Sequence, residues 1–289
     1  MPLQKKAPIA NPPVQHENKL KICYNNTMNP ISNFHTHTQL CNHAEGTPLD
    51  YVEQAIREGC TQLGFSDHCP YPDSFDDCWP NIRMSIDEVP TYLEWIEEAK
   101  EAAPFPVYTG YECEWDSDFS AWYSDDLKST YKADYLVLGP HWVTDGSSHI
   151  YAPDIDNPML LNKYIDQTID GMRSGNFAFV AHPDLFMAGY KEWDEQSKAC
   201  LQAILDAACD LDLPLEINGL GITRTPSDTR RGIRYAYPYC EFWEMVSRSN
   251  ARVICNSDAH HPSDVIFNAW KARDFASRFC LTPIEKPDF

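Results

Sequence analysis

Short apolar runs alternate with amphipathic segments along most of the chain. The apolar runs are rich in β-branched and aromatic residues and are bounded by turn residues, a pattern typical of buried strands. Seven strands are expected, at residues 31–34, 61–66, 106–111, 134–138, 177–181, 213–218 and 252–257. Strands that alternate with helices over seven units predict a parallel sheet, and this number favours a closed or nearly closed α/β barrel over an open doubly wound sheet.

Helical periodicity fills the intervals between these strands. In the first interval Thr47 suits a helix N-cap, Pro48 suits the first helical position, and Gly59 follows the last periodic residue. Further helices are expected at 85–102, 158–174, 192–211, 239–250 and 262–277, whereas 113–133 is less clearly helical. Residues 1–30 show little periodicity, so we expect a flexible N-terminal extension followed by one domain over 31–289.

The composition limits the partners that the protein can bind. Lys and Arg number 23 and Asp and Glu number 43, so the formal net charge is −20. This balance argues against nucleic acid and anionic membrane lipid as partners, because both bind to basic surfaces. No stretch approaches the roughly 20 apolar residues that cross a bilayer. The 11 scattered cysteines form no CxxC pair, and no signal peptide precedes them, which predicts free thiols and a cytoplasmic location.

Residue types that bind metals follow six of the seven predicted strands. In chain order they are His35 and His37, His68, Glu112, His141, His182, and Asp258 with His260. The carboxyl ends of the strands in an α/β barrel meet at one mouth, so these side chains are expected to gather there. A single histidine near a strand is more often structural than a ligand, but six coincidences of this kind indicate a site.

The spacing within the motifs supports a shared site. His35 and His37 are two residues apart, as are Asp258 and His260, and residues at this spacing point to the same side of a strand. His43 follows in a loop that can fold back over the mouth. Imidazole and carboxylate ligands suit Zn²⁺, Mn²⁺ or Fe.

The number of candidate ligands indicates more than one ion. Seven histidines, one glutamate and one aspartate exceed the four ligands of a tetrahedral site. Two or three divalent ions are therefore expected, with Glu112 as the bridging carboxylate. Cys41 and Cys69 adjoin candidate ligands, but the absence of paired thiolate motifs makes a zinc knuckle the weaker alternative.

The motifs HTHT, CxHA, SDHCP, GYE, PHW, AHPDL and SDAH, in this order, resemble those of the polymerase and histidinol phosphatase (PHP) superfamily, and most of all those of its histidinol-phosphate phosphatases. The resemblance covers residues 33 to 265. It implies a distorted (β/α)7 barrel with a trinuclear metal centre. It also implies three ligand sets: His35, His37, Glu112 and Asp258 for one ion; Glu112, His141 and His182 for a second; His43, His68 and His260 for a third.

The same resemblance implies a phosphomonoesterase that hydrolyses a small phosphorylated metabolite, L-histidinol phosphate, in histidine biosynthesis. Two ions can activate a shared hydroxide for in-line attack on the phosphoryl group. Glu112, Asp258 and His260 are the expected catalytic residues, and Asp258 or a ligand histidine is a candidate proton donor to the leaving group. The alternatives are a phosphatase for another small ester and an amidohydrolase-type enzyme, which also begins with HxH and ends with a strand-borne aspartate.

The densest basic run of the chain follows the sixth predicted strand and consists of Arg224, Arg230, Arg231 and Arg234. Arg224 and Arg234 are the expected phosphate contacts, because a guanidinium group can bind two phosphate oxygens at once. An ion-paired surface loop is the alternative. Three divalent ions would add about +6 at the mouth, so a phosphate ester remains a possible ligand of this acidic protein.

Other side chains near the expected mouth have two interpretations each. Trp115, Trp142 and Tyr190 either stack on an imidazole-bearing substrate or pack in the core. Asp67 and Asp184 either orient ligand imidazoles or cap turns.

Overall fold

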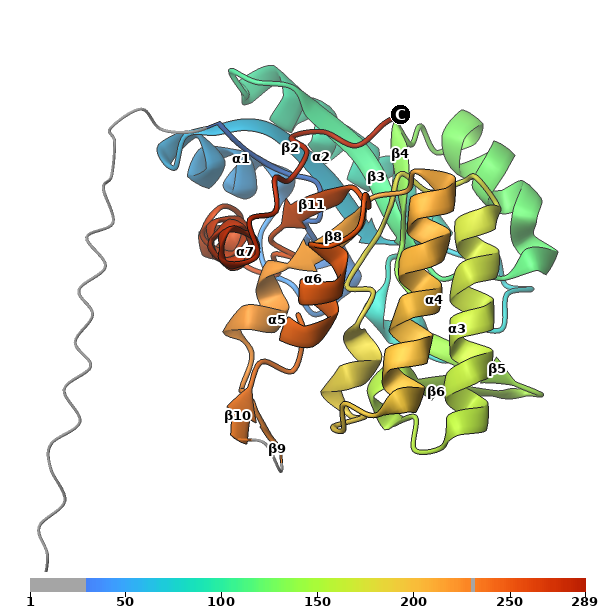
Figure 1. The fold of residues 1–289 in the computed structure, drawn as a ribbon. Helices are drawn as coiled ribbons and strands as arrows, with labels where there is room; N and C mark the ends of the chain where they lie inside the picture. Colours follow the sequence, from blue (N-terminus) through green and yellow to red (C-terminus); the bar gives the residue numbers. More distant parts are fainter. Residues whose placement is uncertain (1–29, 230–231) are drawn as a thin grey trace, which may run out of the picture.

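A seven-stranded parallel sheet forms the centre of the computed structural model, which describes residues 30–229 and 232–289 (Figure 1). The strand order is β1-β2-β3-β4-β7-β8-β11, and each of the seven predicted strands is present. Their bounds are β1 (Ile31–Asn33), β2 (Cys60–His68), β3 (Val107–Cys113), β4 (Tyr135–Leu138), β7 (Phe179–Val180), β8 (Leu215–Asn218) and β11 (Val253–Asn256).

The first and last strands of the sheet meet just beyond their carboxyl ends. Thr36 and Ala259 form a parallel bridge. The His37 amide donates to the Ala259 carbonyl at 2.9 Å, and the Ala259 amide donates to the His35 carbonyl at 3.3 Å. These contacts nearly close the sheet, so the fold is the predicted distorted (β/α)7 barrel.

Helices cover the outside of the barrel. They are α1 (Pro48–Arg57), α2 (Val89–Ala102), α3 (Pro158–Arg173), α4 (Glu195–Leu211), α5 (Gly219–Thr223), α6 (Cys240–Val246) and α7 (Phe267–Arg278). Helix α1 begins as predicted, because the Asp50 carboxylate accepts hydrogen bonds from the Thr47 amide at 2.7 Å and its hydroxyl at 2.8 Å. The reverse turn at its end uses Gly59, whose φ is +77°.

Two predicted helices begin later than expected because a 3-10 turn precedes each of them. These turns are Ile86–Glu88 before α2 and Pro262–Asp264 before α7. The ambiguous segment 113–133 contains a π-helix over Trp122–Thr130. Two antiparallel hairpins were not predicted: β5 (Trp142–Asp145) with β6 (Ser148–Tyr151), and β9 (Ser227–Thr229) with β10 (Gly232–Arg234).

The ring of Tyr135 fills the barrel interior below the mouth. Its hydroxyl donates to the carbonyls of Phe34 at 2.8 Å and Phe65 at 3.1 Å. Gly64 and Gly110 leave room for this ring: a Cβ atom would lie 2.3 Å from the Tyr135 hydroxyl at the first position and 2.6 Å from its ring at the second. The barrel therefore has a packed aromatic core here and is not a channel.

Residues 1–29 hold nearly all of the predicted N-terminal extension and lie outside the described residues. Within the described ranges, no helix combines the length and the apolar character that crossing a membrane requires.

Candidate metal centre

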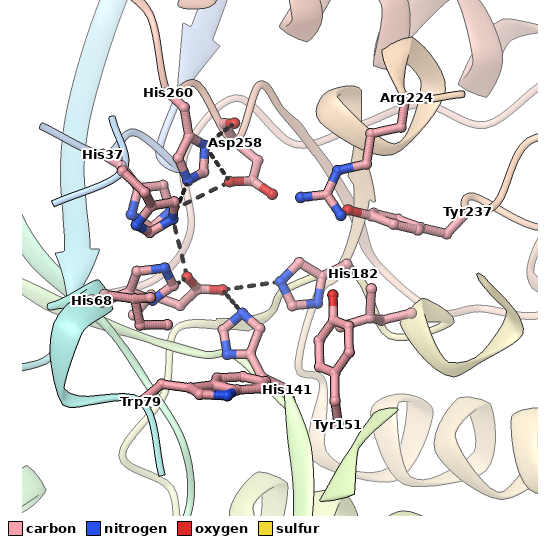
Figure 2. A pocket seen from close by; sticks show the side chains of 14 residues that line it. His37, His68, Trp79, His141, Tyr151, His182, Arg224, Tyr237, Asp258 and His260 are labelled. Atoms are coloured by element: carbon pink, nitrogen blue, oxygen red, sulfur yellow. Dashed lines mark hydrogen bonds and ion pairs between the residues drawn. The ribbon is translucent and has the colours of Figure 1, made fainter. Parts of the chain in front are cut away.

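The predicted metal-binding side chains meet at the carboxyl ends of the barrel strands (Figure 2). Except for His35, which is fully buried beneath them, all of them line one pocket of about 260 Å³. The pocket lining includes His37, His43, His68, Glu112, His141, His182, Asp258 and His260. Two of these residues, His182 and Asp258, have positive φ angles of +29° and +52°. Such strained backbone is concentrated at functional sites in proteins.

The first group of ligand atoms comes from His35, His37, Glu112 and Asp258. His35 Nε2 lies 3.2 Å from His37 Nε2, 3.4 Å from Glu112 Oε2 and 3.5 Å from Asp258 Oδ1. His37 Nε2 lies 3.5 Å from the same glutamate oxygen and 3.3 Å from the same aspartate oxygen. Four ligands at 2.0–2.1 Å from a tetrahedral ion are separated by about 3.3 Å, so this set fits a divalent cation such as Zn²⁺.

The second group uses the other oxygen of Glu112. Glu112 Oε1 lies 3.0 Å from His182 Nε2 and 3.3 Å from His141 Nε2. Its partner Oε2 is buried and accepts no hydrogen bond from the described residues. Because its two oxygens face different groups of imidazole nitrogens, the Glu112 carboxylate has the position that a bridging ligand requires.

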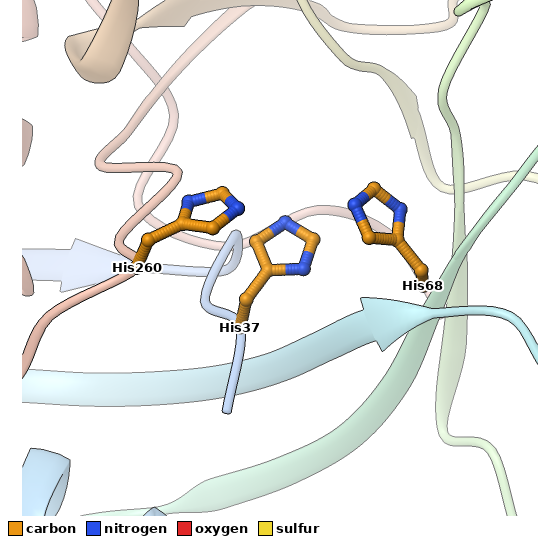
Figure 3. Close-up of side chains that lie close together, drawn as sticks. All are labelled: His37, His68 and His260. Carbon is orange, nitrogen blue, oxygen red and sulfur yellow. The ribbon is translucent and has the colours of Figure 1, made fainter. Parts of the chain in front are cut away.

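The third predicted set is less clearly separated from the other two. His43 Nε2 lies 3.0 Å from His260 Nε2, and Cys41 is close enough to offer its sulfur to the same group. His68 forms one group with His37 and His260, whose rings lie together in Figure 3, and another with Glu112 and His141. His68 is thus placed between the predicted sites.

The charges in the site keep its two ligand carboxylates ionised. Burial opposes ionisation of Glu112, but His141 and His35 outweigh it and hold the pKa of the carboxyl well below its usual range. The pKa of Asp258 is also well below its usual range, since His35, His37 and His260 outweigh the effect of burial. Burial and the charge of His37 lower the pKa of His260 to about 3. Anionic carboxylates and neutral imidazoles are the forms that coordinate divalent ions. The charges of Glu112 and Glu114 outweigh burial and raise the pKa of His141 to about 9, so a bound ion would displace a proton from this imidazole.

A carboxylate on the sixth barrel strand, Glu216, was missed by sequence reasoning. It is fully buried in β8, and its Oε1 accepts a hydrogen bond from His35 Nδ1 at 2.8 Å. Its Oε2 accepts from the His182 amide at 3.0 Å. Glu216 therefore fixes the tautomer of His35 and leaves Nε2 for a metal ion. The sequence signal was an acidic residue inside the apolar strand LPLEIN.

Glu114 has the same relation to His141. Its Oε1 lies 3.1 Å from His141 Nδ1, and its other oxygen accepts from the Arg83 guanidinium at 3.2 Å. Arg83 and Glu114 are both buried. The spacing GYECE places Glu114 two residues after Glu112, and this i, i+2 relation was the available signal.

The two aspartates with alternative interpretations have different roles. Asp67 Oδ1 accepts a hydrogen bond from the Thr38 amide at 2.8 Å and lies 3.6 Å from His37 Nδ1, so it faces His37 and not the adjacent His68. Asp184 accepts from the Tyr239 amide at 2.5 Å and from Trp243 Nε1 at 3.1 Å. Asp184 therefore anchors the start of α6 and orients no ligand imidazole, and burial raises its pKa to about 6.

The structure separates the two arginines predicted to contact phosphate. Arg224 lines the pocket, with its guanidinium carbon 5.8 Å from the centre of the Tyr237 ring. In Figure 2 it projects towards the pocket across from the ligand histidines. Arg230 and Arg231, from the same basic run, lie outside the described residues.

Arg234 does not line the pocket, so its position does not support the predicted phosphate contact. Its guanidinium donates to the backbone carbonyls of Tyr235 at 2.7 Å, Ala236 at 2.8 Å and Met187 at 2.6 Å. It also stacks 4.4 Å from the centre of the Tyr239 ring. Through these hydrogen bonds Arg234 holds the segment after β10 against the segment after β7.

The aromatic residues at the pocket also differ from those expected. The pocket is lined by Trp79, Tyr151 and Tyr237, none of which was predicted. Trp115 and Trp142 are buried in packing contacts, and the Tyr190 hydroxyl donates to Asp194 at 2.7 Å. Core packing is therefore the correct interpretation of the two tryptophans.

The fold and the clustered imidazoles and carboxylates define a (β/α)7-barrel protein with a site suited to metal ions. Residues 33–219 match the family described as PHP domain. This match covers more than half of the chain, and the protein belongs to the PHP domain family.

Several relatives of known name are similar over most of their length. A Deinococcus radiodurans protein named "Probable histidinol-phosphatase" is 26% identical over 254 residues, which cover 83% of this chain and 90% of the relative. A Schizosaccharomyces pombe protein of the same name is 25% identical over 276 residues, which cover 88% of each chain. The crystal structure of a Lactococcus lactis histidinol phosphate phosphatase complexed with zinc, L-histidinol and phosphate has a TM-score of 0.66 at 16% identity, covering 90% of this chain and 99% of that one. At this identity the structural likeness shows a shared fold.

Proposed function

We propose that this protein is a divalent-metal-dependent phosphomonoesterase that hydrolyses L-histidinol phosphate to L-histidinol and phosphate. The observation that carries the proposal is the Glu112 carboxylate, whose Oε2 faces His35 and His37 while its Oε1 faces His141 and His182. A carboxylate shared in this way suits a pair of ions that act on one phosphoryl group. The names of the two relatives and the zinc, L-histidinol and phosphate of the L. lactis complex support this substrate.

The nine predicted ligands are our assignment for holding two or three ions of Zn, Mn or Fe: His35, His37, His43, His68, Glu112, His141, His182, Asp258 and His260. Bound there, the ions would neutralise the phosphate dianion and activate the attacking water. The chain itself supplies the orientation of the ligands. Glu216 directs His35 and Glu114 directs His141 through hydrogen bonds of 2.8 and 3.1 Å to their Nδ1 atoms.

Other side chains that line the pocket are assigned to phosphate binding and proton transfer. We assign the phosphate contact to Arg224, because its guanidinium lines the pocket and is exposed to an incoming ligand. We assign proton transfer to Asp258 or His260, which line the same pocket. Their lowered pKa values leave both side chains unprotonated, so either would first accept a proton from the attacking water and then pass it to the leaving oxygen. The Asp258 carboxylate is held in place by the Asn218 amide, which donates to its Oδ2 at 3.0 Å.

We place the enzyme in the cytoplasm. The ten cysteines in the described residues are free thiols, and cytosolic proteins keep their thiols reduced.

Phosphate release by the full chain, reconstituted with Mn²⁺ or Zn²⁺, tests the proposal. We expect a higher kcat/KM for L-histidinol phosphate than for 4-nitrophenyl phosphate or an amide panel. Glu112→Gln should abolish turnover and lower metal content. Glu53→Gln, a surface control whose carboxylate pairs with Arg57 at 3.2 Å, should leave turnover and metal content unchanged. Hydrolysis of the aryl phosphate alone would refute the histidinol assignment, and full turnover by Glu112→Gln would refute the bridging role.

A further inference from the structure

The pocket also has an apolar part next to its metal-binding residues. The apolar part consists of Trp79, Ile82, Tyr151 and Leu185. In Figure 2 the Trp79 ring lies beside His141 and the Tyr151 side chain lies beside His182. A phosphate bound near the ligand histidines and Arg224 would therefore direct its ester group towards these aromatic rings.

Trp79 is held by two other aromatic rings. Its ring centre lies 5.1 Å from that of Tyr151, at an interplanar angle of 72°, and 5.2 Å from that of Trp142, at 80°. Both contacts are edge-to-face, a favourable geometry for aromatic pairs. Trp142 and Tyr151 are cross-strand partners at the open end of the β5–β6 hairpin. Both ring contacts of Trp79 are therefore made by this end of the hairpin.

The backbone near Trp79 is tied to the metal centre. The Trp79 amide donates to Asp77 Oδ1 at 2.9 Å, and Asp77 Oδ2 lies 2.7 Å from Arg83 Nε. The same buried arginine donates to Glu114, which contacts His141. The Trp79 backbone is therefore linked to His141 through Asp77, Arg83 and Glu114.

We propose that Trp79 and Tyr151 form the subsite for the leaving group and select phosphate esters whose alcohol carries a planar, cationic or aromatic ring. The proposal rests on the function proposed above and names the residues that would recognise its alcohol. Among the described residues that line the pocket, the carboxylates are Glu112 and Asp258, which belong to the assigned ligand set. An ammonium or imidazolium group on the alcohol would meet aromatic faces, where stacking and cation–π attraction stabilise it.

Steady-state kinetics of the metal-reconstituted full chain on two esters tests the subsite. L-Histidinol phosphate carries the ring, whereas 2-aminoethyl phosphate has the phosphate and the ammonium without it. Trp79→Leu is expected to lower kcat/KM for L-histidinol phosphate about two- to tenfold, mainly by raising KM. The same substitution should change kcat/KM for 2-aminoethyl phosphate less than about twofold. Trp79→Phe should recover most of the loss, and Tyr151→Leu should show the same selectivity.

The matched control is Trp270→Leu, which removes a partly exposed tryptophan of α7 that does not line the pocket. This substitution should leave kcat/KM for both esters unchanged. An equal loss on both esters, or no loss on either, would overturn the subsite proposal. If the wild-type protein hydrolyses aryl phosphates but not L-histidinol phosphate, the proposed function fails. The subsite is then tested by the ratio of kcat/KM for phenyl phosphate to kcat/KM for ethyl phosphate. An unchanged ratio in Trp79→Leu would overturn the subsite proposal as well.

Discussion

Replacing Glu216 by glutamine keeps the size of a fully buried side chain but changes its charge and its hydrogen-bonding capacity. Oε1 of this residue accepts from His35 Nδ1 at 2.8 Å and from Asn256 Nδ2 at 3.0 Å. Oε2 accepts from the His182 amide at 3.0 Å and from Asn218 Nδ2 at 2.8 Å. Each carboxylate oxygen of Glu216 thus accepts hydrogen bonds from two donors.

A glutamine can supply an acceptor oxygen at only one of the two positions. With the glutamine oxygen at the Oε2 position, its NH₂ group faces Asn256 Nδ2, which loses its acceptor, and His35 Nδ1. His35 Nδ1 can accept from this NH₂ group only when the imidazole proton moves to Nε2, the atom assigned to the metal ion. Neither asparagine can exchange the positions of its Oδ1 and Nδ2 atoms without losing another hydrogen bond. Asn256 Oδ1 accepts from the Phe34 amide at 2.8 Å, and Asn218 Oδ1 accepts from the Gly221 amide at 3.0 Å. An unsatisfied buried donor costs about 1–3 kcal/mol, so the loss of the acceptor of Asn256 predicts a decrease of about 1–3 kcal/mol in the free energy of unfolding.

Urea unfolding of the metal-free protein measures this loss directly. Since Glu216 orients His35, competition with a chromophoric chelator should also show metal affinity reduced about 10- to 100-fold. Glu53→Gln is the control, because an exposed pair contributes less than about 1 kcal/mol. Unfolding free energy and metal affinity both within error of wild type in Glu216→Gln would refute the reasoning.

Three other perturbations follow from the packing and the charges. Gly64→Ala should lower the unfolding free energy by about 1–3 kcal/mol, measured in urea, because the added Cβ would lie 2.3 Å from the Tyr135 hydroxyl; an unchanged value would contradict the packing described for the barrel interior. Arg224→Ala should raise KM for a phosphate ester, whereas Arg234→Ala should lower the Tm and leave KM within twofold; the reverse result would place the phosphate contact at Arg234. Removal of metal with a chelator should lower the Tm in calorimetry, by the equivalent of about 4 kcal/mol for ions present at 1,000 times their Kd, and a Tm indifferent to chelation would argue against a built metal site.

The barrel and the clustering of candidate ligands were predictable from the sequence because both depend on local patterns. Buried parallel strands are short apolar runs, and the carboxyl ends of such strands converge whatever the details of packing. For this reason His35, Glu112 and Asp258 could be placed together although more than 140 residues separate the last two. The capping of α1 by Asp50 was predictable for the same reason, since its partners are three residues apart.

The interactions that sequence reasoning missed join segments far apart in the chain. Glu216 contacts His35 across 181 residues, and Glu114 contacts Arg83 across 31. Trp79 reaches the pocket only because the β5–β6 hairpin packs against its ring. No local sequence pattern predicts these pairs, because each contact depends on how segments that follow different strands pack together at the mouth of the barrel.

By itself the sequence determined the strands, most of the helices, the barrel and the set of imidazoles and carboxylates at its mouth. Only the tertiary structure decided which of two nearby arginines faces the pocket, which carboxylates orient the ligand imidazoles and which aromatic rings line the apolar part. The physical reason is that periodicity fixes the face on which a side chain lies, whereas hydrogen-bond partners depend on three-dimensional distance. Arg234 illustrates the difference: three backbone carbonyls within 2.8 Å hold its guanidinium away from the pocket.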